Sequence, residues 1–335
     1  MRRSWWSWTL QLALVATVAW FVGQALVRHW AEFRSYQLDL SAHPGLIVAA
    51  LLCIWLGYAV LIMAWRGVVV GWGESMDHLV AARVWALSSL GKYIPGKLWA
   101  VAGMVVLAQR AGVRPLTATG SAVVMQILAL GTGSAVVAAT GAASLAELGL
   151  GFRIGLLVLL LASLGGTALL LEPKWLGRVL DHLPLSRPRS GPGSGAGAGS
   201  TAGGPMGAGA PGAPGTVSPT APSIVAGAIG NAGAWIAYGV AVWLLARALV
   251  PGTPFPLAAT IGAFTASYVI GFLALFVPGG LGVREGVFIL MLQGSTGLAA
   301  ATVMALASRL LFTLAEVGVA VPFLIFPRGV SRAAS

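Results

Sequence analysis

The chain has 335 residues, of which 58% are hydrophobic and only 9% are charged. Soluble domains carry about 25% charged residues, so this composition excludes a soluble globular protein and indicates an integral membrane protein with several spans. The formal net charge is +11, but the basic residues lie at the ends of apolar segments. That placement is typical of topology signals and of contacts with anionic lipids. We therefore expect membrane lipids as partners and no nucleic acid.

Residue types that carry enzymatic or metal chemistry are few. The single cysteine, Cys53, lies inside an apolar segment and is expected to be a packing residue. The four histidines are scattered and have no metal-ligand spacing: His29, His43, His78 and His182. The sequence also has no nucleotide-binding glycine motif and no nucleophile elbow. We expect no catalytic residue, no metal and no cofactor, and hence a protein that is not an enzyme.

The N-terminal part of the chain predicts two spans joined by a polar loop. Residues 1–8 are basic and rich in tryptophan, which suits a membrane interface. Residues 9–27 are apolar and long enough to cross, and we expect a retained helix that starts in the cytoplasm. Residues 46–65 form the second predicted span. Residues 71–83 are polar.

A Pro-Gly break then interrupts apolar sequence at Pro95-Gly96. Proline removes an amide donor and glycine permits unusual backbone angles, so the helix is expected to break here. Inside lipid, unpaired backbone groups cost several kcal/mol each, so such a break belongs in a protein core or beside a wet cavity. The apolar segments on either side are too short to span. They predict a re-entrant helical hairpin near residues 84–110.

Residues 116–140 and 151–171 predict two further spans, which complete an N-terminal membrane half over residues 1–185. Residues 186–222 follow, and from residue 190 they consist almost entirely of Gly, Ala, Ser, Pro and Thr. This composition lacks the apolar residues that a fold requires and predicts a flexible cytoplasmic linker.

The C-terminal membrane half, residues 223–335, repeats the same order of segments. Residues 223–250 predict a span, and a second break at Pro278-Gly279-Gly280 lies within a second re-entrant hairpin near residues 257–293. Residues 298–326 predict the last span. Basic residues follow that span, so we expect the C-terminus in the cytoplasm, like the N-terminus.

The two halves align as an internal repeat. Pro95 aligns with Pro278, and at the same separation Gln126 aligns with Arg309. The positive-inside rule places the bases of the two hairpins on opposite sides of the membrane. The predicted fold is all-α: a polytopic membrane protein with about six full transmembrane helices and two re-entrant hairpins in an inverted repeat. In such layouts a substrate site lies near the midplane, where broken helices meet.

The two breaks also carry a resemblance to a known family. Residues 88–97 (SSLGKYIPGK) and 276–286 (FVPGGLGVREG) resemble two signatures of the lysylphosphatidylglycerol synthase transmembrane region, a flippase-like family. The resemblance implies lipid translocation, with lysyl transfer carried out by a separate soluble domain. Few residues follow Arg328, so we do not expect the synthase activity here.

We predict that both breaks contribute to one substrate site for an anionic headgroup. Helix N-termini and basic side chains bind anions, and glycines allow a headgroup close to the backbone. The predicted substrate-binding residues are Lys92, Tyr93, Pro95, Gly96, Lys97, Pro278, Gly279, Gly280, Arg284, Glu285 and Arg309. Two alternatives stay open: the lysines anchor at the cytoplasmic interface, and Glu285 forms a structural ion pair with Arg309 instead of a gate. Glu316 is expected on the same helix face as Arg309, in the same network.

The predicted function is translocation or binding of an anionic phospholipid or a polyprenyl-phosphate-linked headgroup in the cell membrane. One alternative is a scaffold that does not transport but holds a partner lipid synthase or glycosyltransferase. Another alternative is a membrane enzyme acting on lipid, which would require a nucleophile or a metal cluster.

Overall fold

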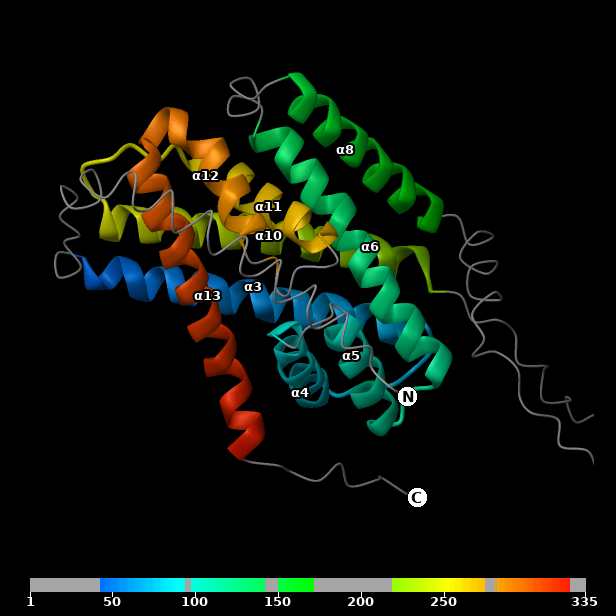
Figure 1. Cartoon of the computed structure of the whole chain (residues 1–335). Coiled ribbons are helices and arrows are strands. Elements are labelled where there is room, and N and C mark those ends of the chain that lie inside the picture. Colours follow the sequence, from blue (N-terminus) through cyan, green and yellow to red (C-terminus); the bar gives the residue numbers. More distant parts are fainter. Residues whose placement is uncertain are drawn as a thin grey trace, which may run out of the picture.

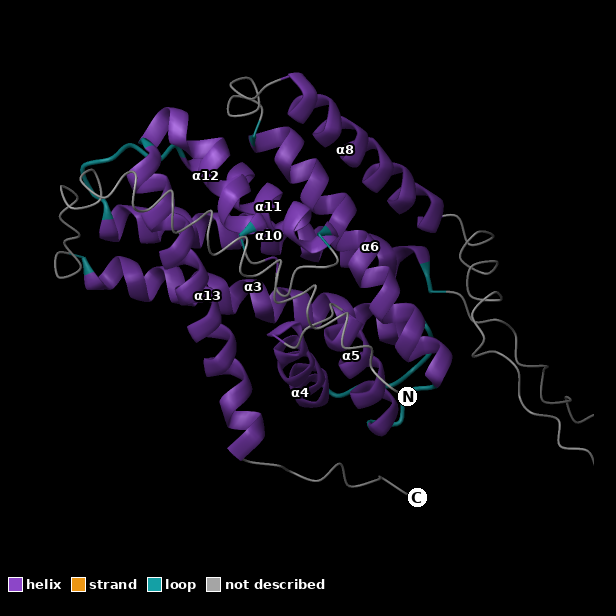
Figure 2. Cartoon of the chain, viewed as in Figure 1, coloured by secondary structure: helices purple, strands orange, loops and turns teal. Residues whose placement is uncertain are grey.

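The computed structural model describes residues 43–93, 98–141, 150–171, 219–274, 280 and 282–325. Within these ranges the chain is helical and contains no strand, which confirms the all-α prediction (Figures 1 and 2). The elements are α3 (Pro44–Gly71), α4 (His78–Ser89), the 3₁₀ helix η1 (Leu90–Tyr93), α5 (Leu98–Arg110), α6 (Pro115–Thr140), α8 (Leu150–Leu171), α10 (Ala221–Leu249), α11 (Leu257–Leu273), α12 (Val283–Thr296) and α13 (Leu298–Ile325).

Four of these helices, α3, α6, α10 and α13, are long and apolar enough to cross a membrane. Each coincides with a predicted span. α8 also coincides with a predicted span and packs along α6 (Figure 1). The predicted first span, residues 9–27, lies outside the described residues, as does nearly all of the predicted linker at 186–222. α11 is a shorter apolar helix of 17 residues.

Local sequence signals set where the helices begin. α3, α6 and α10 each have a proline in the first turn, where its missing amide hydrogen costs nothing. α4 begins because the Asp77 carboxylate accepts a hydrogen bond of 2.8 Å from the Leu79 amide. The first hairpin, predicted near residues 84–110, therefore has a first helix that already starts at His78, within the polar residues 71–83.

The centre of the fold is the antiparallel pair of α3 and α10, which lie side by side in Figure 1. Gly57 packs against the ring of Tyr238, and Gly71, the last residue of α3, packs against Ser223 in the first turn of α10. Because these glycines have no side chain, the two backbones approach closely, as is common between membrane helices. The Gly57–Tyr238 and Gly71–Ser223 contacts show that α3 and α10 run in opposite directions.

Each half continues with a helical hairpin that flanks a Pro-Gly break. In the first hairpin α4 and η1 pack against α5, and a Cβ on Gly91 would lie 2.8 Å from the Ala100 nitrogen. In the second, α11 packs against α12, and Gly271 and Gly280 both face the stem of Arg284. Gly280 has φ +69°, a backbone angle that favours glycine. In the sequence, α6 follows the first hairpin and α13 follows the second.

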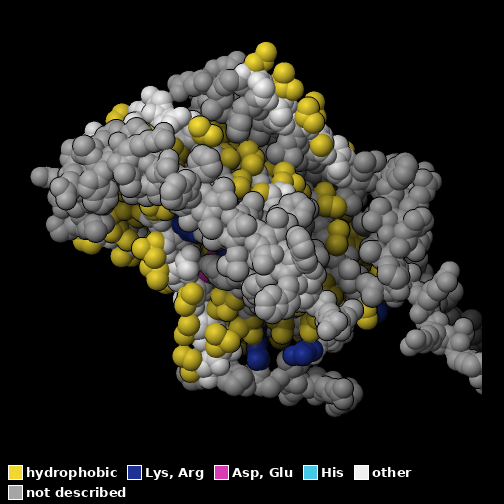
Figure 3. Space-filling model, viewed as in Figure 1, with side chains coloured by type: hydrophobic (Ala, Val, Ile, Leu, Met, Phe, Trp, Pro, Cys, Tyr) yellow, Lys and Arg dark blue, Asp and Glu magenta, His cyan; other side chains and the backbone are white. Residues whose placement is uncertain are grey.

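The outer surfaces of the long helices are apolar. α13 exposes large aliphatic side chains along one face, including Leu310, Leu314 and Leu324. Figure 3 shows such apolar side chains over the outside of the molecule, with charged side chains in a hollow near the centre of the same view. Exposed aliphatic stripes of this kind suit contact with lipid chains.

Candidate functional site

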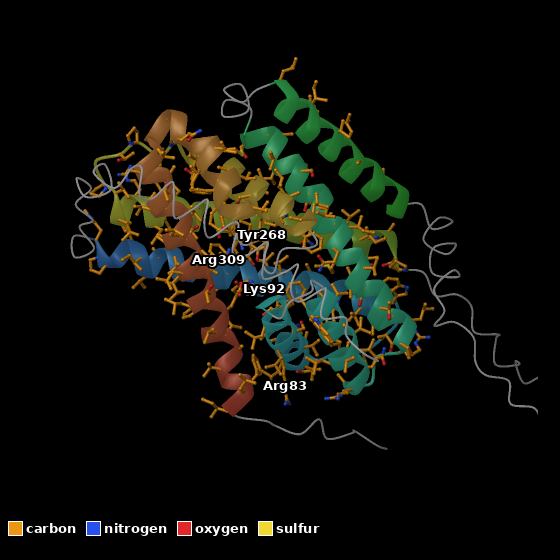
Figure 4. The ribbon with its side chains drawn as sticks, viewed as in Figure 1. Arg83, Lys92, Tyr268 and Arg309 are labelled. Carbon is orange, nitrogen blue, oxygen red and sulfur yellow. The ribbon has the colours of Figure 1, made fainter. Side chains whose placement is uncertain are left out.

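A cavity of about 260 Å³ lies where the two hairpins, the α3–α10 pair and α13 meet. Aromatic and apolar side chains form most of its wall. Among the described residues, the charged groups that line it are Lys92, Arg284, Arg309 and Glu316. Figure 4 places Lys92, Tyr268 and Arg309 together at the centre of the molecule, whereas Arg83 lies apart at its lower edge. An apolar chamber with a few convergent charges is the usual form of a small-ligand site.

Lys92 connects the first hairpin to the last helix. Its ammonium group forms an ion pair with the Glu316 carboxylate, which is 3% exposed. The Tyr58 hydroxyl donates a hydrogen bond of 2.7 Å to the same carboxylate oxygen. Lys92 lies in η1, the 3₁₀ helix that directly follows α4. A buried carboxylate requires such partners, since an unpaired charge in the interior is costly.

The two hairpins meet on one residue, Tyr268 of α11. Lys92, which precedes the first break, donates from Nζ to the Tyr268 hydroxyl at 3.5 Å. Arg284, which follows the second break, places its guanidinium carbon 3.8 Å from the centroid of the Tyr268 ring. This cation–π contact holds the guanidinium beside the cavity. The Arg284 Nε is buried and has no hydrogen-bond partner among the described residues.

A second ion pair fixes the start of α12. Arg309 of α13 pairs with Glu285, and the other Glu285 oxygen accepts a hydrogen bond of 2.6 Å from the Gly282 amide. The carboxylate thus caps the helix N-terminus while it neutralises Arg309. The predicted pairing of Glu285 with Arg309 is present. Glu316 lines the same cavity as Arg309, as its place on the helix predicts, and its ion pair is with Lys92.

An aromatic cluster forms another part of the cavity wall and contacts the charged groups. Tyr238 packs edge-on against the rings of Tyr58 and Phe312, with centroid separations of 5.6 and 5.3 Å. Trp235 and Tyr268 extend the cluster, with their centroids 5.5 Å apart. The Tyr238 side chain is buried, and its hydroxyl has no hydrogen-bond partner among the described residues.

The structure describes six of the eleven predicted site residues at least in part. Lys92, Arg284 and Arg309 line the cavity, and Glu285 lies beside it against the two arginines. Gly280 packs against Arg284, and Tyr93 ends η1. The other five lie outside the described residues: Pro95, Gly96, Lys97, Pro278 and Gly279.

The cavity residues that the prediction missed include three tyrosines: Tyr58, Tyr238 and Tyr268. The chain has only five tyrosines, and these three line the cavity. A signal for them exists in the sequence, because a phenol within an apolar span requires a hydrogen-bond partner. That signal does not indicate which partner, so it does not place the three hydroxyls in one site.

A further charged contact lies at the base of the first hairpin, outside the spanning helices. Arg114, just before α6, donates from Nε to Glu74 at 2.6 Å and from its amide at 3.1 Å. Burial favours a higher pKa for Glu74, but the hydrogen bonds from Arg114 outweigh it and lower the pKa below its usual value. Arg66 donates to the Met76 carbonyl at 2.7 Å and fixes the same loop.

The long apolar helices and the charged chamber at the helix breaks define an integral membrane protein. Its family follows from a match of residues 8–325 to the family model described as lysylphosphatidylglycerol synthase TM region. The chain belongs to that family, and the resemblance seen in the two break motifs is confirmed over nearly the whole chain. No curated protein matches the chain significantly.

Proposed function

We propose that this protein binds an anionic lipid headgroup in the central cavity and moves it across the cell membrane without converting it chemically. The observation that carries this proposal is the meeting of Lys92 and Arg284 on Tyr268, inside a cavity of about 260 Å³. Two cations from opposite hairpins thereby face one chamber. A phosphate at the bilayer centre requires such compensation, because an uncompensated charge costs about 3 to more than 10 kcal/mol there.

The charge balance of the described site favours an anion. Three cations, Lys92, Arg284 and Arg309, stand against two carboxylates, Glu285 and Glu316. Lys92 and Arg309 each form an ion pair with one carboxylate, whereas Arg284 rests on an aromatic ring. Since a guanidinium binds phosphate through a planar fork of donors, Arg284 is the residue best suited to bind the headgroup.

The arrangement of the halves suits a carrier that opens alternately to each side. Each half has a long helix, a broken hairpin and a second long helix, and α3 runs antiparallel to α10. This order supports the inverted repeat that the sequence predicts, with about six spans and the substrate at the repeat interface. The arginines at the base of the first hairpin, among them Arg66 and Arg114, favour a cytoplasmic position for that base.

The experiment is a translocation assay in liposomes that contain the purified protein and a fluorescent phosphatidylglycerol. A membrane-impermeant reductant quenches only the outer leaflet, so lipid movement is read as the loss of protected fluorescence. We expect the Arg284→Ala variant to lose most of this movement while it stays folded. Arg247→Ala is the matched control, because Arg247 also stacks on an aromatic ring, Trp243, but is not among the described cavity residues. Wild-type rates in Arg284→Ala would refute the proposal.

The same liposomes test whether the protein acts as an enzyme. Mass spectrometry of the labelled lipid before and after incubation should show one unchanged species. A covalent product that requires the protein would contradict the proposed transport without chemistry.

A further inference from the structure

The Tyr238 hydroxyl is the one polar group of the aromatic wall that the described residues leave unsatisfied. Tyr238 lines the cavity and is 5% exposed, and its buried hydroxyl makes no hydrogen bond to any described residue. A buried donor without a partner costs about 1–3 kcal/mol. A ligand in the cavity that accepts this hydrogen bond would recover that energy.

Tyr238 and Glu316 share two neighbours in the cavity wall. Its ring contacts Phe312, which is one helical turn before Glu316 on the same face of α13. Its ring also contacts Tyr58, whose hydroxyl donates to Glu316 at 2.7 Å. All four side chains line the same chamber. A ligand group at this wall therefore meets a phenol hydrogen and a carboxylate together.

The chemistry of that pair selects the ligand group. An ammonium group only donates, so it would leave the phenol hydrogen without an acceptor. A phosphate oxygen accepts, but Glu316 would repel its charge. An alcohol hydroxyl both accepts from Tyr238 and donates to the carboxylate.

We infer that Tyr238 and Glu316 form a hydroxyl-binding subsite, and that the cavity takes a headgroup in which an alcohol is linked to a phosphate. The inference rests on the proposed function, because the phosphate is assigned to Arg284, whereas Lys92 is paired with Glu316. The hydroxyl comes either from a glycerol headgroup or from a sugar on an isoprenyl phosphate. Tyr238 is thus a specificity-determining residue, because its hydrogen bond makes these headgroups bind more tightly than a bare phosphate.

The test compares the affinities of the full-length protein in detergent for short-chain lipids with identical acyl chains. Wild-type protein should bind phosphatidylglycerol about fivefold more tightly than phosphatidic acid. This affinity ratio corresponds to the free energy of one hydrogen bond. Phosphatidylethanolamine, whose ammonium group only donates, should show no such advantage. In Tyr238→Phe the preference should disappear, because binding of phosphatidylglycerol weakens and binding of phosphatidic acid does not. A short isoprenyl phosphate with and without one sugar distinguishes the second source of the hydroxyl.

Ser134→Ala is the matched control. Ser134 of α6 also has a buried hydroxyl with no partner among the described residues, but it is not among those that line the cavity. Its removal should leave every affinity unchanged. Tyr238→Phe keeps the ring and its packing, so the variant should fold, and its thermal melting checks this directly.

The outcomes separate the inference from the proposed function. If Arg284→Ala weakens all lipids while Tyr238→Phe leaves the preference intact, only the inference fails. Equal weakening of phosphatidylglycerol and phosphatidic acid by Tyr238→Phe would also overturn it, as would wild-type binding of phosphatidylethanolamine as tight as that of phosphatidylglycerol. If wild-type protein binds none of these lipids, both proposals fail.

Discussion

Lys92 and Glu316 form an ion pair although 224 residues separate them in the sequence. The contact joins the residue just before the first break to the last helix, and the Tyr58 hydroxyl adds a link to α3. Arg309 and Glu285 make an equivalent contact between α13 and the second hairpin. α13 therefore forms an ion pair with each hairpin. It supplies the anion, Glu316, in the first pair and the cation, Arg309, in the second.

Glu316→Gln should destabilise the protein because it removes the counterion of Lys92 inside the helix bundle. The Lys92 side chain is 28% exposed, so we expect a loss of about 2 kcal/mol, less than for a fully buried pair. Thermal melting in detergent measures it as a Tm lower by several degrees. The double variant Lys92→Gln/Glu316→Gln should recover most of the loss, since no charge is left unpaired. A double variant less stable than Glu316→Gln would contradict this account.

Gly271→Ala should weaken binding of the lipid phosphate without unfolding the protein. A Cβ at Gly271 would overlap the stem of Arg284 and push the guanidinium away from Tyr268. We expect phosphatidic acid to bind about tenfold more weakly, the equivalent of one charge-assisted hydrogen bond. Gly286→Ala on the neighbouring helix has open space around the new methyl group and should bind as the wild type does. Equal affinities for the two variants would disprove this role of Gly271.

The Glu74–Arg114 contact should make the first hairpin's base sensitive to acid. The hydrogen bonds from Arg114 lower the pKa of Glu74, so the contact stabilises the folded state above the unfolded pKa, about 4.3. As pH falls toward the lowered folded pKa, that contribution is lost. Wild-type protein should thus melt slightly above Glu74→Gln at pH 7, and the two Tm values should converge in acid. The difference is small, because Arg114 is half exposed. A Tm difference that does not change with pH would argue against this assignment.

Much of the fold follows from local features of the sequence. The spans of α3, α6, α10 and α13 follow from the length of their apolar segments, and helix starts such as that of α6 at Pro115 follow from one residue. The ion pair of Glu285 with Arg309 was predictable because a charge within an apolar span requires a nearby counterion, and these two residues are only 24 apart. α4 begins within the polar residues 71–83, because the Asp77 carboxylate caps the helix at His78.

The sequence by itself determined that this is a helical membrane protein of the lysylphosphatidylglycerol synthase TM region family, with two broken hairpins that carry positive charge. Only the tertiary structure decided that Lys92 pairs with Glu316 and that both hairpins meet on Tyr268. The reason is physical: hydropathy and helix breaks act over a few turns, whereas a contact across more than 170 residues depends on how whole helices pack. The same packing brings Tyr238 and Glu316 into one cavity, which no local pattern predicts.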